Sequence, residues 1–379
     1  MDDDIEEAAV QIVGAVLDRV GAPAPYASSH PLTVGPLDLD DPGPGEVLVR
    51  VEAAGVCHSD LSVVDGSRAR PTPMLLGHEA AGIVEATGEG VDDLAVGTRV
   101  VLTFLPRCGA CPECETGGRL PCRVGSAANA AGTLVGGAGR LTRGGAPVRH
   151  HLGVSAFATH AVVSRTSVVP VDADVPPDVA ALLGCAVLTG GGAVVNAGRP
   201  RDGDTVAVVG LGGVGMAALL VAVALGHPVV GIDPVPGKRE TALRLGAVAV
   251  HDPAHVGGVR APVVVEAAGS SRAFQTALAV TAPGGTTVTV GLPAPTDLAT
   301  LAPLTLTAEA RTIVGSYLGS AVPARDIPRY VRLWREGRLP LEELVSSRIA
   351  LDDLDVALDR LAAGRELRQL ITFDERTDP

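Results

Sequence analysis

The sequence is poor in aromatic and in basic side chains. Only 2% of its 379 residues are Phe, Trp or Tyr, so any core must be built mainly from Ala, Val and Leu. That composition suits parallel sheets covered by helices, whose strands are buried on both faces. The chain has 30 Lys and Arg against 43 Asp and Glu, a formal net charge of −13. This balance argues against nucleic acid or an anionic membrane as a partner.

Long apolar runs and targeting signals are also missing. No apolar run approaches the ~20 residues of a membrane span. The segment Met1–Glu7 is acidic, unlike a secretory signal or an Arg-rich transit peptide, and we expect it to be a frayed extension. The sequence therefore predicts a soluble, cytoplasmic protein. With 379 residues, of which 46% are hydrophobic, about two domains are expected.

The stretch Asp204–Asp233 has the order strand, glycine turn, helix, strand, acid. An apolar β-branched run, Thr205–Val209, reads as a buried parallel strand. The helix Met216–Leu225 and the strand Pro228–Ile232 follow, and Asp233 ends the unit. The turn is a G-x-G-x-x-G motif, formed by Gly210, Leu211, Gly212, Gly213, Val214 and Gly215.

Each part of this stretch has a physical reason. Gly210 allows the tight turn, Gly212 lets the backbone approach a pyrophosphate, and Gly215 lets the helix pack closely on the strand. The helix N-terminus offers N–H groups to the phosphates. Asp233 would bind the adenosine ribose and repel a 2′-phosphate, and it has no adjacent Arg. A lone glycine motif is a weak sign in a chain with 47 Gly, but the whole unit predicts binding of NAD rather than NADP.

Four of the six cysteines lie close together. Their spacing is C-x2-C-x2-C-x7-C, formed by Cys108, Cys111, Cys114 and Cys122. Four thiolates so spaced are typical of a closed, tetrahedral, structural zinc site. Disulfides are a poorer interpretation because cysteines two residues apart rarely bridge well. An iron–sulfur cluster is the other alternative that the spacing leaves open.

The N-terminal part, Ala15–Gly97, reads as β-rich. It holds two short segments with metal-ligand residue types, Gly55–Asp60 and Gly77–Glu79. Taken alone, Cys57 is more typical of a small buried hydrophobe, and His78 of a satisfied histidine. Short strands are expected at Val47–Ala53, Ala81–Ala86, Thr98–Thr103, Ala158–Val163 and Ser167–Val171.

Later segments alternate between helix and strand. Gly125–His151 reads as a Gly/Ala-rich loop, either a solvated surface or a wall of the substrate cleft. Helices are expected at Ala180–Gly192, Lys238–Gly246, Arg272–Ala279, Tyr330–Glu336 and Leu351–Ala362. Strands are expected at Val248–His251, Val263–Glu266, Thr286–Val290, Val345–Ile349 and Gln369–Phe373.

From about Ala15 to Phe373 the chain resembles the zinc-dependent alcohol dehydrogenases of the medium-chain dehydrogenase/reductase (MDR) superfamily. The pieces that carry the resemblance occur in the family's order: Cys57-His-Ser-Asp, Gly77-His-Glu, the four-cysteine lobe, Cys185 with Thr189, the glycine motif, and Asp233 with Lys238. The resemblance implies an α/β fold with a β-rich GroES-like catalytic domain and a Rossmann doubly wound parallel sheet. The implied domains are 1–186 with a zinc lobe at 105–124, 187–315 for the nucleotide, and a C-terminal return at 316–379.

The resemblance also implies a catalytic zinc held by Cys57, His78 and Cys185, and hence two Zn²⁺ per chain. Three protein ligands leave a fourth position for water or the substrate oxygen. The metal would lower the pKa of an alcohol, whose alkoxide passes a hydride to NAD. Asp60 would orient the bound imidazole and Glu79 would lie beside the metal. Ser59 would start the proton relay, although a turn serine is its plainer reading.

Cofactor and substrate residues carry over in the same way. The family places Lys238 near the ribose, Thr189 and Val290 at the nicotinamide, and His58 and Arg368 near the pyrophosphate. Phe104 and His151 would line the substrate pocket.

Three departures from the family matter. Ser62 stands where many relatives have a histidine that passes the proton to solvent, so the exit route stays open. His151 and Ala127 stand where the liver-type relatives have larger apolar residues, which predicts a roomier or more polar cleft and favours a substrate bulkier than ethanol. The loop Gly125–Leu152 is long, as in relatives that form homodimers, so a homodimer is expected by analogy.

The predicted function is reversible oxidation of an alcohol to an aldehyde or ketone. The alternative enzyme is a thiol-adduct dehydrogenase of the formaldehyde type, for which the basic loop Arg140–His151 would hold an acidic thiol. A non-enzymatic zinc- and nucleotide-binding protein is disfavoured because the site residues occur together.

Overall fold

The computed structural model describes residues 10–373. Within that range the chain forms two compact units. The first comprises residues 10–114, 122–184 and 345–373, and the second residues 115–121 and 185–344. Residues 316–344, which the sequence analysis assigns to the return segment, therefore belong to the second unit. The prediction for Met1–Glu7 lies outside the described residues.

The first unit is rich in strands, as predicted. A closed barrel contains β1 (Val10–Leu17), β2 (Leu32–Leu39), β7 (Leu141–Arg143), β8 (Ala146–His150) and β4 (Met74–Leu75). A second sheet has the order β10 (Val168–Pro170), β6 (Arg99–Leu102), β5 (Ala80–Thr87), β3 (Glu46–Val56), β18 (Arg368–Thr372) and β17 (Val345–Ile349), with β9 (His160–Ser164) also paired to β3. This arrangement confirms the β-rich GroES-like architecture.

Aliphatic side chains fill the barrel. Leu37, Leu39 and Leu75 are almost fully buried and belong to one cluster that contains only aliphatic residues. Gly14 leaves room for this packing, because a Cβ atom there would lie 2.9 Å from Leu75 Cδ1. The scarcity of aromatic residues is therefore met by close packing of small and branched side chains.

Short helices border the first unit. They are α1 (Tyr26–Ser29), α2 (His58–Val64), α3 (Arg123–Ala131), α4 (Pro177–Leu182) and α11 (Leu354–Ala362). The prediction that Gly125–His151 is a loop was wrong, because the segment contains most of α3 and the hairpin β7–β8. The Cys122 Sγ atom accepts from Gly125 N at the start of α3, and Gly132, with φ 70°, ends it.

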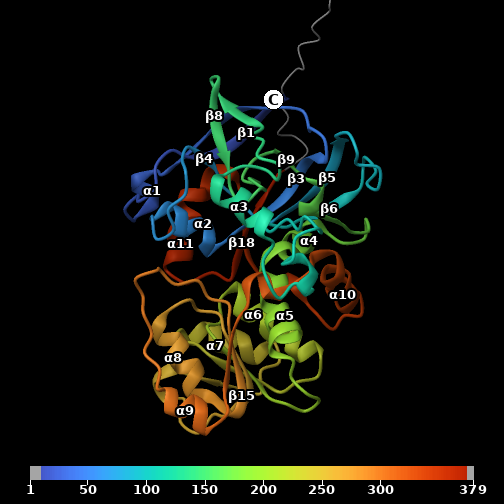
Figure 1. Cartoon of the computed structure of the whole chain (residues 1–379). Helices are drawn as coiled ribbons and strands as arrows, with labels where there is room; N and C mark the ends of the chain where they lie inside the picture. Colours follow the sequence, from blue (N-terminus) through green and yellow to red (C-terminus); the bar gives the residue numbers. More distant parts are fainter. Residues whose placement is uncertain (1–9, 374–379) are drawn as a thin grey trace, which may run out of the picture. The chain divides into compact units, whose positions relative to one another are not determined.

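The second unit holds a six-stranded parallel sheet. Its order is β13 (Ala249–His251), β12 (Val229–Ile232), β11 (Val206–Val209), β14 (Ala261–Glu266), β15 (Thr281–Thr289) and β16 (Thr312–Gly315). In chain order this is 3-2-1-4-5-6, the doubly wound arrangement that binds dinucleotides where the order reverses. The Rossmann prediction is confirmed, and Figure 1 shows α8 and α9 beside β15.

The helices of the second unit are α5 (Leu188–Gly192), α6 (Gly213–Ala224), α7 (Pro236–Arg244), α8 (Ser271–Val280), α9 (Pro303–Ala308) and α10 (Pro323–Arg335). Four of these six start where proline or serine favours a start: α7, α9 and α10 at a proline, and α8 after Ser270. Helix α10 begins seven residues before the predicted start at Tyr330, with Pro323 in its first turn. Short 3₁₀ turns are η1 (Cys114–Thr116), η2 (Arg165–Ser167), η5 (Pro253–His255), η6 (Tyr317–Ser320), η7 (Leu341–Leu344) and η8 (Leu351–Asp353).

One helical segment corrects the statement that no apolar run approaches membrane length. Pro177–Gly198 spans 22 residues and is apolar enough to cross a membrane by length and composition. It consists of α4, the π-helical turn η3 (Leu183–Val187), α5 and a second π-helical turn, η4 (Ala193–Gly198). Because 83% of its apolar window is buried inside the protein, it has the character of a core helix.

Candidate active site and metal centres

The four-cysteine lobe forms a compact cluster of thiols. One sulfur atom from each of Cys108, Cys111, Cys114 and Cys122 lies within 4.8 Å of the other three. The Cys111 Sγ atom is 3.5 Å from that of Cys114 and 3.8 Å from that of Cys122. All six cysteines lie in the described part of the chain, and none is in a disulfide there.

These separations fit a tetrahedral metal. Zinc–sulfur bonds of ~2.3 Å at tetrahedral angles place sulfur atoms about 3.8 Å apart. Backbone N–H groups of Cys108 and Gly125 approach the Cys122 sulfur at 3.4 Å, which favours a thiolate there. The residues present therefore fit a closed zinc site.

The loop between the third and fourth lobe cysteines, residues 115–121, is part of the second unit. Arg325 Nη1 donates to the Gly117 carbonyl oxygen at 3.2 Å. Gly118 has a φ of 97°, and a Cβ there would lie 2.4 Å from the Ser320 carbonyl oxygen. Only glycine fits this close approach of two backbones.

A second ligand cluster brings together the three residues predicted for the catalytic metal. The ligand atoms of Cys57, His78 and Cys185 lie within 4.8 Å of one another, and all three residues are buried. Cys57 precedes α2, and His78 lies between β4 and β5. Cys185 lies in η3, one residue beyond the end of the first unit at Gly184. Two thiols and an imidazole are ligands that zinc prefers.

Asp60 fixes the orientation of two of these ligands. Its side chain is fully buried, its Oδ2 atom accepts from Cys57 N at 3.0 Å, and its Oδ1 atom is 2.9 Å from His78 Nδ1. With Nδ1 engaged, His78 can offer Nε2 to a metal. The first turn of α2 thus presents the thiol and anchors the imidazole.

Charges reinforce this arrangement. Burial opposes ionisation of Asp60, but the neighbouring His78 and His151 outweigh it and bring the pKa of Asp60 to about 2. Burial alone would lower the pKa of His78, yet Asp60 and Cys57 raise it well above its ordinary value. Asp60 is therefore a carboxylate across the working pH range.

His151 and Phe104, both predicted for the substrate pocket, lie against the His78 ring. The ring centroids are 5.6 Å apart for His151 and 5.4 Å apart for Phe104, and both contacts are edge-on. His151 Nε2 is 3.4 Å from Asp60 Oδ1. Burial lowers the pKa of His151 despite the neighbouring carboxylate.

Glu79 and Arg368 form a buried ion pair. Arg368 Nε is 3.0 Å from Glu79 Oε1, and both side chains are at most 3% exposed. Arg368 Nη1 also donates to the Val56 carbonyl oxygen at 3.3 Å. The pair connects β18, β3 and the residue after His78, so it braces the segment that carries the imidazole.

The remaining α2 residues differ in exposure. Ser59 is partly buried in the first turn, whereas His58 is exposed. Ser62 Oγ donates to the His58 carbonyl oxygen at 2.8 Å. The hydroxyl that stands in place of the family's relay histidine is thus engaged with its own helix.

The glycine motif has the shape that a dinucleotide needs. Gly210 has a φ of 91°, and a Cβ there would lie 2.7 Å from Ala268 N. A Cβ at Gly215 would lie 1.8 Å from the Gly210 carbonyl oxygen. A Cβ at Gly212 would meet nothing within 4 Å, so the space before the N-terminus of α6 is open to a pyrophosphate.

Asp233 connects the end of β12 to this turn. Its carboxylate accepts from Leu211 N at 2.7 Å and from Val235 N at 2.8 Å. Sequence reasoning missed Arg239, whose Nη1 donates to the Asp233 carbonyl oxygen at 2.6 Å and lies 3.4 Å from Asp252 Oδ2. Its place one turn into α7 is the signal that could have identified it.

Other predicted cofactor residues lie on several elements of the second unit. Thr189 is buried in α5, Lys238 is partly exposed in α7, and Val290 follows β15. Val290 N donates to the Glu266 carbonyl oxygen at 2.9 Å.

The basic loop is occupied by contacts within the first unit. Arg140 Nε is 2.8 Å from Glu46 Oε2, and Arg143 forms an ion pair with Asp18. His150 is buried, and its Nε2 atom accepts from Arg140 N at 3.0 Å. Within this loop, Arg140, Arg143 and His150 thus have partners in the first unit, whereas Arg149 is exposed.

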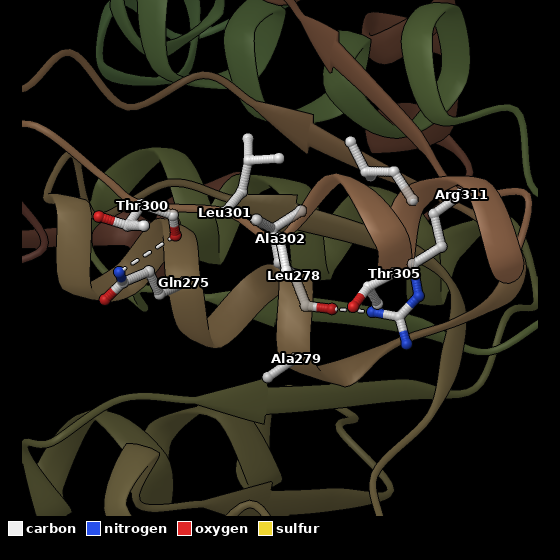
Figure 2. Close-up of a pocket in the computed structure, with 9 residues that line it drawn as sticks. Gln275, Leu278, Ala279, Thr300, Leu301, Ala302, Thr305 and Arg311 are labelled. Carbon is white, nitrogen blue, oxygen red and sulfur yellow. Dashed lines mark hydrogen bonds between the residues drawn. The ribbon is translucent and has the colours of Figure 1, made fainter.

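A pocket lies elsewhere in the second unit, with a volume of about 190 Å³. Leu278, Leu301 and Leu306 line it, and Arg311 donates to the Leu278 carbonyl oxygen (Figure 2). Gln275 Nε2 donates to the Thr300 carbonyl oxygen at 3.3 Å, and both residues also line the pocket. None of the predicted site residues lines this pocket.

The chain matches two family models. Residues 43–173 match the alcohol dehydrogenase GroES-like domain, and residues 213–336 match the zinc-binding dehydrogenase family.

Similar proteins cover nearly the whole chain. A putative alcohol dehydrogenase D of Mycobacterium tuberculosis is 38% identical over 359 residues, 91% of this chain and 97% of that protein. An NDMA-dependent alcohol dehydrogenase of Amycolatopsis methanolica is 35% identical, over 91% of this chain and 96% of that protein. The crystal structure of benzyl alcohol dehydrogenase from Acinetobacter calcoaceticus has a TM-score of 0.87 at 31% identity, covering 96% of this chain and 100% of that one.

Fold, ligand clusters and sequence similarity agree on one family. Two domains of the expected architecture, thiolate-rich clusters and relatives above 30% identity along nearly the whole length leave no competing assignment. The chain belongs to the zinc-dependent alcohol dehydrogenases of the medium-chain dehydrogenase/reductase superfamily.

Proposed function

We propose that this alcohol dehydrogenase oxidises, reversibly, an alcohol bulkier than ethanol with NAD as the hydride acceptor. The observation that carries the proposal is the cluster of Cys57, His78 and Cys185, whose ligand atoms lie within 4.8 Å of one another. Zinc held there would act as a Lewis acid on the substrate oxygen, and a second zinc in the lobe would be structural.

The chain's own residues would prepare the site. Asp60 holds the His78 ring through Nδ1 and the Cys57 backbone through its N–H group, so two ligands share one anchor. Ser59 would hydrogen-bond the substrate oxygen and start the proton relay, receiving the substrate's proton as its own hydroxyl proton passes on toward solvent. Glu79 would lie beside the metal, and its ion pair with Arg368 keeps its charge balanced.

NAD is the proposed cofactor because Asp233 carries a buried carboxylate at the end of β12, where a 2′-phosphate would be repelled. Gly210 to Gly215 would seat the pyrophosphate, with His58 and Arg368 near it. Lys238 would lie near the ribose, and Thr189 and Val290 near the nicotinamide.

The proposed substrate is a primary or secondary alcohol that is bulkier than ethanol. His151 and Ala127 stand in place of larger apolar residues, and Phe104 supplies an aromatic edge beside His78. A similar protein is named for benzyl alcohol, which fits this size class.

We also propose a cytoplasmic homodimer. Light scattering on the purified chain tests the dimer, and a monomer would contradict it.

Metal analysis and turnover together test the proposal. Mass spectrometry should find two zinc per chain in wild type, one in Cys57→Ala and one in Cys111→Ser. Wild type should reduce NAD with benzyl alcohol more efficiently than with ethanol, and Cys57→Ala should lose turnover.

Two results would contradict parts of the proposal. One zinc per wild-type chain, or full turnover by Cys57→Ala, would reject the metal mechanism. Turnover with NDMA as acceptor but without reduction of added NAD would reject NAD as the exchangeable cofactor and keep the alcohol chemistry.

A further inference from the structure

We propose that His151 is a positioning residue, which acts through Asp60 on the metal ligand His78 and thereby strengthens zinc binding at the three-ligand site. The inference rests on the proposed function, because it presumes that Cys57, His78 and Cys185 hold zinc. It goes beyond that function by giving His151 a role other than lining the substrate pocket.

The first observation is the environment of Asp60. A fully buried carboxylate is costly unless donors surround it. Oδ2 has the Cys57 N–H group at 3.0 Å, and Oδ1 has His78 Nδ1 at 2.9 Å. The third polar group facing this carboxylate is His151 Nε2, 3.4 Å from Oδ1. Asp60 is thus the common partner of a ligand's backbone, a ligand's ring and His151.

The second observation concerns the hydrogen-bond partners of the His151 ring nitrogens. Its side chain is 1% exposed, and within residues 10–373 neither ring nitrogen has a hydrogen-bond partner of ordinary geometry. A buried ring nitrogen without a partner is unfavourable. A shift of about 0.5 Å would bring Nε2 and Oδ1 to ordinary hydrogen-bond length. The polar edge of His151 is therefore aimed at the anchor of the metal ligand.

The third observation is that the backbone holds the ring in place. His151 N donates to Ser155 Oγ at 2.8 Å, and Ser155 Oγ donates to the Leu75 carbonyl oxygen at 2.9 Å. Leu152 and Ser155 adopt φ values of 53° and 54°, which form a tight turn after β8. The His151 ring lies edge-on against His78, which also has an edge-on contact with Phe104.

The contact between His151 and Asp60 should affect the affinity of the three-ligand site for zinc. A carboxylate that holds a ligating imidazole fixes its tautomer and raises its basicity, and losing such a partner costs 10- to 100-fold in metal affinity in typical cases. His151 acts one contact further out, by keeping the Asp60 carboxylate oriented toward Nδ1 of His78. Removing its polar edge should therefore weaken zinc binding by about 10-fold.

The test compares His151→Phe with His151→Gln in the full-length protein. Phe keeps an aromatic ring against His78 but has no N–H group, whereas Gln can still donate to Asp60. Zinc affinity at the three-ligand site is measured by competition with a chelator at pH 7.5. Zinc retained by the cysteine lobe reports that each variant is folded.

The matched control is His150→Phe. His150 is equally buried and adjacent in sequence, but its Nε2 atom accepts from Arg140 N. This variant should change zinc affinity by less than about twofold. Cobalt substitution adds a spectroscopic readout, because the Cys₂His ligand set should keep its band shape in every variant.

We expect the zinc dissociation constant to rise about 10-fold in His151→Phe and less in His151→Gln. An unchanged constant in His151→Phe overturns the inference. A loss beyond about 1,000-fold with an altered cobalt spectrum also overturns it, because His151 would then be a ligand itself. If wild type holds only the lobe zinc, the proposed function fails first, so the two failures are distinguishable.

Discussion

Gly212 separates the requirements of the fold from those of the cofactor. A Cβ atom at Gly212 would meet nothing within 4 Å, and its backbone is extended, with φ −78° and ψ −170°. Ala is therefore compatible with the folded chain, and Gly212→Ala should change the free energy of unfolding by only about 0.5 kcal/mol, because the poorer N-cap is partly offset by the smaller entropy of the unfolded chain.

The same methyl group should interfere with NAD. It would occupy the open space where a pyrophosphate must approach the N–H groups at the start of α6. A hydrogen bond to a charged group contributes roughly 1.5–3 kcal/mol. Losing one should raise the dissociation constant for NAD about 10- to 100-fold, at 1.4 kcal/mol per factor of ten.

Gly215→Ala is the matched control. A Cβ there would lie 1.8 Å from the Gly210 carbonyl oxygen, so the helix could not keep its packing on β11. This variant should lose roughly 3 kcal/mol or more of unfolding free energy. Urea titration and calorimetric NAD binding measure both quantities. Wild-type NAD affinity in Gly212→Ala would refute the placement of the pyrophosphate.

Two further changes test the first unit. Arg368→Ala removes the buried guanidinium partner of Glu79 and should cost about 3–5 kcal/mol of unfolding free energy. The double variant Glu79→Gln/Arg368→Met should recover much of this loss, because neither charge is then left without its partner. A loss below about 1 kcal/mol in Arg368→Ala would show that the pair is unimportant for stability. Burial, helped by Arg140, lowers the pKa of His150 from 6.5 to about 4. As the pH falls, the imidazole therefore binds a proton in the unfolded chain before it does so in the folded chain. The free energy of unfolding should fall between these two pH values, by up to about 3 kcal/mol. Urea titrations at pH 7 and pH 5 should show a smaller drop for His150→Gln than for wild type, and equal drops would contradict this account.

The nucleotide-binding unit could be predicted well from the sequence because its signals are local. The valine runs of β11 and β14 are buried on both faces, and the turn between β11 and α6 has its glycines where backbone contacts demand them. Edge strand β16 was missed, because its four residues, Thr312–Gly315, are only partly buried or exposed and carry little apolar pattern.

The loop prediction for residues 125–151 was wrong for a different reason. Its Gly/Ala composition suggests a loop, yet a cysteine sulfur caps α3, which no capping rule anticipates. The hairpin β7–β8 did carry a signal, since Gly144 and Gly145 both adopt positive φ in the turn that joins the strands. The Gly-Gly pair could therefore have predicted it.

Contacts between residues that are far apart in the sequence also limited what could be predicted. The zinc-ligand set came from a resemblance and not from spacing, since Cys57 and Cys185 are far apart in the chain. Nothing in the sequence places His151 beside Asp60, because a turn after β8 and a helix after β3 must first form. Arg239 likewise gains its contact with the Asp233 carbonyl oxygen only once α7 is folded.

The loop 115–121 gives the chain an interleaved topology. The backbone passes from one unit to the other after residues 114, 121, 184 and 344, so neither unit is a continuous stretch of sequence. A fragment that starts at Cys185 would lack Gly117, whose carbonyl oxygen accepts from Arg325, and Gly118, which approaches the Ser320 backbone. Grafting the nucleotide-binding unit onto another catalytic domain at a single junction should therefore yield an incomplete protein. Cys114 and Cys122 of the lobe flank that loop, so any such recombination must carry the lobe with it.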